Sequence, residues 1–246
     1  MINRGVLMIG SNDEAIGAKI DIRNYYRFLT GLNGGVWEEN EIIDPLYNPS
    51  YYDLFSMIER LKNCNLDYLI VFFSGHGKTI RDLQICFNDK GDYIEESALK
   101  GIAQRQLTIF DCCRAVEHFR EDSVLTKSFS ASSSLNNNVR EFIKQKYNER
   151  IIHAFPQQAT LYSCKRGQMS NGSSTEGAIY FKNLLKSARN VNGEFKTIGE
   201  THLEAVVPTI NESRLEGYLQ EPEAIMPKCA PDKQLIMTIN SAYYLR

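Results

Sequence analysis

A histidine and a cysteine each stand just beyond a run of apolar residues that is typical of a buried strand. His76 lies between two glycines after the run 68–73, and Cys113 lies shortly after the run 106–110. A thiolate is the reactive nucleophile, and a nearby imidazole can take the proton from the thiol and later give it to a leaving amine. If the two strands are neighbours in one sheet, this pair of residue types predicts acyl transfer at a peptide bond.

Other interpretations of these residues stay open. A Ser-Gly-His-Gly string alone is equally typical of a turn whose histidine binds a backbone carbonyl. Free cysteine is among the most frequently buried residue types, so Cys112 and Cys113 are each compatible with a packing role. Side chains alternate along a strand, which predicts that only one of the two thiols faces the cleft. For the same reason adjacent cysteines would make poor joint ligands in a zinc site with Cys164 and His76.

Strands and helices that alternate along the chain must position this pair. Runs rich in β-forming residues predict strands over 6–9, 68–73, 83–87, 106–110, 159–163 and 234–239. Apolar residues at helical spacing predict helices over 18–29, 51–61, 97–103, 181–188 and 198–210, the second of them capped by Ser50. This alternation predicts a mainly parallel sheet with helices on both faces. Functional loops of such sheets lie beyond the carboxyl ends of the strands, where His76 and Cys113 fall.

Composition places the chain among ordinary soluble globular proteins. Of its 246 residues, 43% are hydrophobic and 24% are charged, and the formal net charge is −2. A charge this small predicts no attraction to nucleic acid or to anionic membranes, and no stretch approaches the roughly 20 apolar residues of a membrane span. The start of the chain lacks the features of a secretory signal, and the six cysteines show no repeated CxxC spacing. We therefore expect one cytoplasmic domain over residues 1–246, with its cysteines as thiols.

Two motifs and their order resemble the caspase-like clan of cysteine peptidases, which includes caspases and metacaspases. Residues 72–77, FFSGHG, are similar to the strand-borne histidine motif of that family, and residues 109–114, IFDCCR, are similar to its cysteine motif. The resemblance implies an α/β three-layer sandwich with a mainly parallel central sheet of about six strands. It also implies a cysteine endopeptidase that needs no organic cofactor, with calcium dependence left open.

The resemblance assigns roles to individual residues. The metacaspase pattern consists of an acidic residue, then any residue, then the nucleophile. It maps onto Asp111, Cys112 and Cys113. Cys113 would attack, Cys112 would support it, and His76 would act as general base and acid. The backbone N–H groups of Gly77 and Cys113 would form the oxyanion hole, and Asp111 would line the pocket for the substrate side chain that precedes the cleaved bond.

Substrate contacts implied by the resemblance lie at the end of the strand 159–163 and in the loop after it. Ser163 and Cys164 match the region where the family pairs with its substrate. The carboxylate of Asp111 would favour arginine or lysine, whereas Arg166 stands where metacaspases of basic preference carry acidic residues and would oppose that preference. Glu176 would compensate for Arg166, unless both are simply solvated loop charges.

A Ser- and Asn-rich segment follows the cysteine motif. We expect residues 123–156 to form an inserted activation loop with one polar helix, because many members of the resembled family carry a cleaved or rearranged loop at this place. Its partners would be a protein or peptide substrate and an activating protease or regulatory partner. Two rival functions stay open, a non-catalytic caspase-like scaffold and a flavodoxin-like ligand-binding domain in which His76 and Cys113 are incidental.

Overall fold

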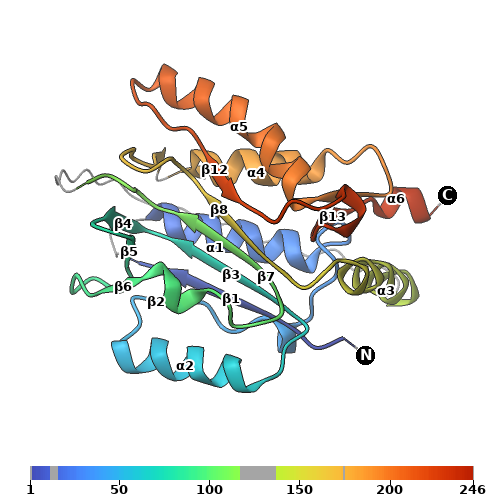
Figure 1. Cartoon of the computed structure of the whole chain (residues 1–246). Helices are drawn as coiled ribbons and strands as arrows, with labels where there is room; N and C mark the ends of the chain where they lie inside the picture. Colours follow the sequence, from blue (N-terminus) through green and yellow to red (C-terminus); the bar gives the residue numbers. More distant parts are fainter. Residues whose placement is uncertain (1, 12–15, 117–136, 174, 246) are drawn as a thin grey trace.

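A six-stranded sheet forms the centre of the molecule (Figure 1), in the strand order β12-β8-β7-β3-β1-β2. The computed structural model describes residues 2–11, 16–116, 137–173 and 175–245. The strands of the sheet are β1 (Arg4–Gly10), β2 (Leu46–Tyr47), β3 (Tyr68–Ser74), β7 (Arg105–Asp111), β8 (Gln157–Tyr162) and β12 (Glu223–Ile225). Neighbouring strands are parallel except for β12, which runs antiparallel to β8. The expected sheet of about six mainly parallel strands is confirmed.

Both faces of the central strands are buried, which explains their continuous apolar runs. In β3, Tyr68, Ile70 and Phe72 pack into the cluster on one face of the sheet. Leu69, Val71 and Phe73 pack into the cluster on the other face. Because this alternation continues past the apolar run, the residues just beyond it are also directed to opposite sides of the sheet.

Different elements cover the two faces and make three layers (Figure 1). The first face is covered by α1 (Ile16–Thr30), α3 (Asn137–His153), α4 (Ile179–Arg189), α5 (Ile198–Leu215) and the strand pair β11 (Phe195–Thr197) and β13 (Ile236–Ile239). The second face is covered by α2 (Tyr51–Asn63) and a small antiparallel sheet of β4 (His76–Thr79), β5 (Leu83–Cys86) and β6 (Tyr93–Glu95). Ser50 caps α2 by accepting the Asp53 N–H, as expected. The α/β three-layer sandwich is therefore confirmed.

Antiparallel β12 also bears on the flavodoxin-like alternative. The five parallel strands follow the order β2-β1-β3-β7-β8, which a flavodoxin-like sheet shares. A sixth strand, β12, is added antiparallel beside β8 and brings the C-terminal part of the chain to that edge.

Among the described residues, no helix is both long enough and apolar enough to cross a membrane.

Two expected elements differ from the structure. The segment expected as a helix over 97–103 is a short 3-10 turn, Glu96–Leu99. The side-chain oxygen of Gln106 accepts the N–H groups of Ile102 and Ala103, so these groups bind outside a helical ladder. The final strand, β13, pairs with β11 and does not join the central sheet.

The segment expected as an insertion over 123–156 is partly core. Residues 117–136 lie outside the described residues, but α3 follows them and buries Ile143, Tyr147 and Ile151 against the first face. These positions are four residues apart and therefore share one side of the helix. The polar residues around them concealed this narrow apolar stripe, so the helix expected within this segment packs on the core of the domain.

Truncating Ile143 tests this placement of α3. We expect Ile143→Ala to lower the free energy of unfolding by about 2–5 kcal/mol, because a fully buried isoleucine leaves a cavity when it is shortened. Ile152→Ala on the same helix is the matched control: its side chain is 61% exposed, and the expected change is within about 0.5 kcal/mol. Urea unfolding of both variants provides the measurement, and equal losses would contradict the packing of α3.

Candidate active site

The chain segments that carry His76 and Cys113 run side by side beyond the ends of β3 and β7. Ser74 is the register partner of Asp111 at the last step of the two strands. The Gly75 N–H donates to the Asp111 carbonyl over 3.1 Å, and the Thr79 N–H donates to the Ala115 carbonyl over 3.0 Å. These two hydrogen bonds bracket the histidine and the cysteine, and so bring both to the same edge of the sheet.

Close backbone approach explains the glycine after His76. A Cβ placed on Gly77 would lie 2.6 Å from the Cys113 carbonyl oxygen and 2.7 Å from the Cys112 sulfur. Since real Cβ atoms are not found at such distances, only glycine fits beside the cysteine pair. The His76 side chain is exposed, and its backbone N–H donates to the hydroxyl of buried Ser11 over 3.3 Å.

The two adjacent cysteines point to opposite sides, as alternation along a strand predicts. Cys112 is 1% exposed and belongs to the apolar cluster on the face covered by α2. Cys113 is partly exposed, and its thiol donates to the carbonyl oxygen of Ser170 with an S···O distance of 3.5 Å. Only Cys113 is therefore placed to meet a ligand.

The Cys113 thiol is not a ready-made thiolate. Burial raises its pKa, and the negative charge of Asp111 adds to that effect, while the contact with the Ser170 carbonyl opposes it. A thiol with a raised pKa carries its proton at neutral pH, so nucleophilic attack needs a base to remove it. An imidazole on the adjoining segment is a group of the required kind.

Asp111 lies beneath Cys113 as a buried carboxyl group. One oxygen accepts the Ser170 hydroxyl over 2.7 Å, and the other accepts the Phe181 N–H over 3.2 Å. Asp111 is 3% exposed, because the loop that contains Ser170 and the start of α4 cover it. A ligand group can reach this carboxyl only if that cover moves.

A second buried carboxyl, Asp21 on α1, was missed by the sequence analysis. It accepts the Ser74 hydroxyl over 2.8 Å and the Ala178 N–H over 3.0 Å. The signal was available, because Asp21 adjoins Ile22 on the face of the predicted helix that otherwise carries apolar residues. A charged residue on such a face is rarely buried unless it has partners.

The two carboxyl groups influence each other's protonation. Burial, opposed by hydrogen bonds from Ser170, Ser163 and the Phe181 N–H, raises the pKa of Asp111 to about 6. Burial raises the pKa of Asp21 well above its usual value, and the charge of Asp111 raises it further. Since two like charges in a buried site repel, the pair favours a state in which one member is neutral.

This raised pKa predicts how stability depends on pH. The neutral form of Asp111 stabilises the fold fully below its unfolded pKa near 3.8, and this stabilisation is lost as the pH rises through about 6. We expect the free energy of unfolding of Asp111→Asn to fall less between pH 4 and pH 7 than that of the unaltered chain. Urea unfolding across this range measures it. The exposed Asp89→Asn serves as control, and parallel pH profiles for the unaltered chain and Asp111→Asn would count against the prediction.

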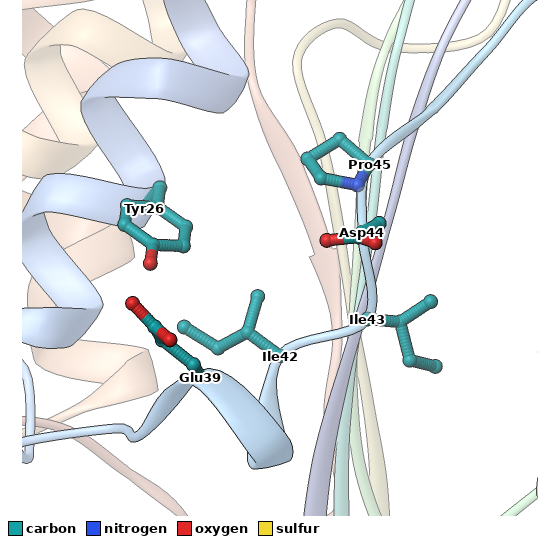
Figure 2. Close-up of a pocket in the computed structure, with 6 residues that line it drawn as sticks. All are labelled: Tyr26, Glu39, Ile42, Ile43, Asp44 and Pro45. Carbon is teal, nitrogen blue, oxygen red and sulfur yellow. The ribbon is translucent and has the colours of Figure 1, made fainter.

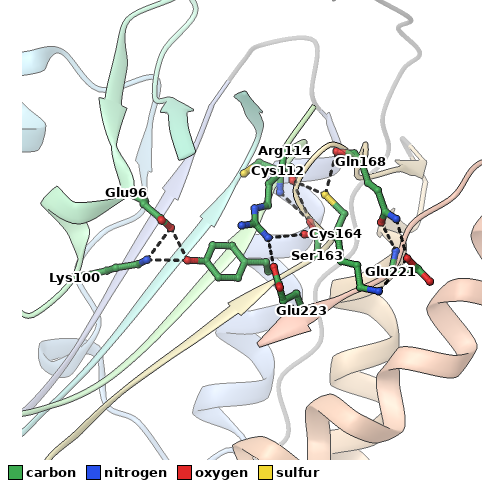
Figure 3. A network of polar contacts seen from close by, with 11 residues as sticks. Glu96, Lys100, Cys112, Arg114, Ser163, Cys164, Gln168, Glu221 and Glu223 are labelled. Carbon is green, nitrogen blue, oxygen red and sulfur yellow. Dashed lines mark hydrogen bonds and ion pairs between the residues drawn. The ribbon is translucent and has the colours of Figure 1, made fainter. Parts of the chain in front are cut away.

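Ser163 and Cys164 support the cysteine motif from the end of β8 (Figure 3). The Ser163 hydroxyl accepts the Cys112 N–H and also lies 3.2 Å from the Cys112 carbonyl oxygen. The thiol of Cys164 donates to the carbonyl of Gln168 over 3.4 Å. Both side chains are fully buried, so they hold the backbone at Cys112 and at the loop beyond, and do not line an open cleft.

The other two substrate-binding candidates lie apart from Asp111. Arg166 is exposed, and its guanidinium donates to the carbonyl of Ile80 over 3.2 Å. Glu176 is exposed and forms a 2.7 Å ion pair with Lys182. The structure therefore brings Asp111 together with Asp21 and Ser170, and it leaves Arg166 and Glu176 as surface charges of the loop.

A cavity of about 310 Å³ lies beside the edge of the sheet near β1 and shares no residue with this site. Figure 2 shows that Tyr26 and Glu39 point toward each other across it, with Asp44 on the strand side. Ile42, which also lines it, pairs with Val6 in the middle of β1, well before the carboxyl end of that strand. Over the ranges that the structure describes, no three His, Cys, Asp or Glu side chains are grouped to hold a metal ion.

Comparisons with known proteins show the family and the fold of the chain. The family model described as the caspase domain matches residues 4–227. Among solved structures, caspase-1 from Spodoptera frugiperda is similar, with a TM-score of 0.54 and 12% sequence identity over 91% of this chain and 85% of that one. At this identity the likeness concerns the fold alone. No curated protein matches the sequence.

Proposed function

The chain belongs to the caspase-domain family, and we propose that it is a cysteine endopeptidase with Cys113 as nucleophile and His76 as general base. One observation carries the proposal: the segments bearing these residues adjoin at the carboxyl ends of β3 and β7, while the neighbouring Cys112 is buried in the core. Cys113 is partly exposed and Cys112 is buried, so Cys113 is the available thiol of this cysteine pair.

The proposed reaction uses two side chains, two backbone N–H groups and water. His76 takes the proton of the Cys113 thiol, and the sulfur attacks the carbonyl carbon of the peptide bond. Backbone N–H groups of Gly77 and Cys113 stabilise the resulting oxyanion. The imidazolium then protonates the leaving amine as the C–N bond breaks and a thioester forms. Water, deprotonated by His76, hydrolyses the thioester and restores the thiol.

We further propose that the substrate side chain before the cleaved bond is arginine or lysine. Asp111 and Asp21 place two carboxyl groups beneath Cys113, and above about pH 6 the Asp111 carboxyl carries its charge. A buried carboxylate favours a guanidinium or ammonium group through charge-assisted hydrogen bonds. Because Ser170 now covers Asp111, the substrate side chain would displace the Ser170 hydroxyl.

A caspase-like peptidase acts on protein or peptide substrates. Labelling of the chain with a peptide electrophile therefore tests whether it is such a peptidase. A peptide chloromethyl ketone ending in arginine should modify Cys113 at one equivalent per chain, at a rate that falls when His76 is replaced by alanine. Iodoacetamide is the matched control, since it alkylates thiols without needing a substrate pocket. Slow and uniform labelling of all thiols by both reagents would contradict the peptidase and favour the non-catalytic scaffold.

A further inference from the structure

Arg114, the residue after the proposed nucleophile, is held from three directions. Its backbone N–H donates to the Gln168 carbonyl, and its carbonyl accepts the Gly167 N–H, each over 2.9 Å. Its guanidinium donates to the Cys164 carbonyl over 3.1 Å and to the Glu223 carboxylate over 2.6 Å. Arg114, which follows Cys113 directly, is therefore bound both to the loop that carries Gln168 and to β12 through Glu223.

An aromatic ring fixes the plane of the same guanidinium. Its central carbon lies 4.0 Å from the centre of the Tyr162 ring. The Tyr162 hydroxyl accepts from Lys100 over 2.8 Å and donates to Glu96 over 2.7 Å, so the ring is itself anchored at its far end. Figure 3 shows the Arg114 side chain directed toward Glu223 on β12.

Glu223 is the acidic partner of Arg114, and it lies on the edge strand β12. It stands 109 residues after Arg114 in the chain and pairs across from Tyr162 in the register of β12 with β8. The Arg114 side chain is 11% exposed and that of Glu223 is 43% exposed. A partly buried ion pair with one stacked member has a more defined geometry than an exposed pair, which commonly contributes little.

We propose that Arg114 and Glu223 are positioning residues for the proposed peptidase reaction, which hold the Cys113 peptide in the orientation that catalysis needs. The proposal rests on the proposed function and deepens it. The oxyanion donor at Cys113 and its sulfur share one backbone unit, and rotation of that unit moves both away from the substrate carbonyl. A misplacement of about 1 Å near reacting atoms can cost roughly a hundredfold in rate.

Replacing the charge of Glu223 without changing its shape tests the pair. We expect Glu223→Gln to lower kcat about tenfold, with KM within about twofold, because the reacting groups lose their alignment while the substrate pocket is unchanged. kcat is measured on a fluorogenic arginine peptide and normalised to active sites titrated with the chloromethyl ketone. This normalisation removes any loss from misfolded chains, which a purely structural role would cause.

A double-variant cycle measures the coupling. Arg114→Met keeps an apolar side chain over Tyr162 and removes the charge. If the two residues act as one unit, adding Glu223→Gln to Arg114→Met should lower kcat no further. Glu59→Gln is the matched control, because it removes the same charge from an ion pair on α2, with Lys62, far from Cys113 in the fold. We expect its kcat to stay within about twofold of the unaltered enzyme.

Each outcome separates the two proposals. No Cys113-dependent hydrolysis by the unaltered chain would overturn the proposed function, and this inference with it. Hydrolysis that is present but unaltered in Glu223→Gln would overturn the inference alone. Losses that multiply in the double variant would also overturn it, since independent residues are not a positioning pair. A fall in kcat with no further fall in the double variant would support it.

Discussion

Replacing Cys113 by alanine is expected to lower peptide hydrolysis by about 10⁴-fold or more, because it removes the sulfur on which the proposed covalent intermediate forms. His76→Ala should cost a similar factor, since a thiol with a raised pKa needs a base. Residues that act as a unit are not additive, so the double variant should be no slower than Cys113→Ala. Hydrolysis of an arginine-containing peptide pool, followed by mass spectrometry, measures all three.

Cys112→Ala is the matched control for this prediction. It changes the neighbouring thiol in the same way, but that side chain lies in the core beneath α2. Hydrolysis should remain measurable, while the free energy of unfolding should fall by about 1–2 kcal/mol from lost packing. If Cys112→Ala abolished hydrolysis and Cys113→Ala did not, the assignment of the nucleophile would be wrong.

Asp111→Asn is expected to lower kcat/KM for cleavage after arginine or lysine by roughly a hundredfold, because losing one partner of a buried charge pair costs about 2–5 kcal/mol. The amide keeps the shape of the carboxylate, so Ser170 and the Phe181 N–H retain a partner. A peptide pool in which every amino acid occurs before the scissile bond provides the measurement. The effect is the change in the ratio of kcat/KM for basic residues to kcat/KM for neutral residues at that position.

Two surface variants show whether this preference depends on the buried pair. Arg166→Ala and Glu176→Gln should leave the profile within about twofold, since their side chains bind Ile80 and Lys182 and not Asp111. Asp21→Asn should also leave the basic preference within about twofold, because the raised pKa of Asp21 makes it the neutral member of the pair, and the amide removes no charge. A preference for acidic residues that disappears in Arg166→Ala would overturn the proposed specificity.

Periodicity in the chain was enough to predict the strands that carry the site. Continuous apolar runs at β3 and β7 indicate strands that are buried on both faces. Such strands are typical of a parallel sheet that is covered by a further layer on each side. The opposite directions of Cys112 and Cys113 follow from the same alternation. The order of the histidine and cysteine motifs was then sufficient to indicate the family that the caspase-domain match shows.

Local pattern was a weaker guide where polar residues surround the buried ones. In α3, a stripe of Ile143, Tyr147 and Ile151 is buried within a mostly polar helix, so composition indicated an insertion and not a core element. The segment expected as a helix over 97–103 failed for a related reason. Its backbone groups are bound by the side chain of Gln106, a contact that helix propensity does not describe.

Tertiary packing alone brings together the parts of the site that are far apart in the chain. Asp21 reaches Ser74 across 53 residues, and Arg114 reaches Glu223 across 109. Apolar spacing reports which face of a helix or strand is buried, because each element must hide that face from water. It carries no information on which polar side chain of another element meets that face. The pairing of Asp21 with Asp111 and the ion pair of Arg114 with Glu223 are therefore decided only by the packing of α1 and β12 against the sheet.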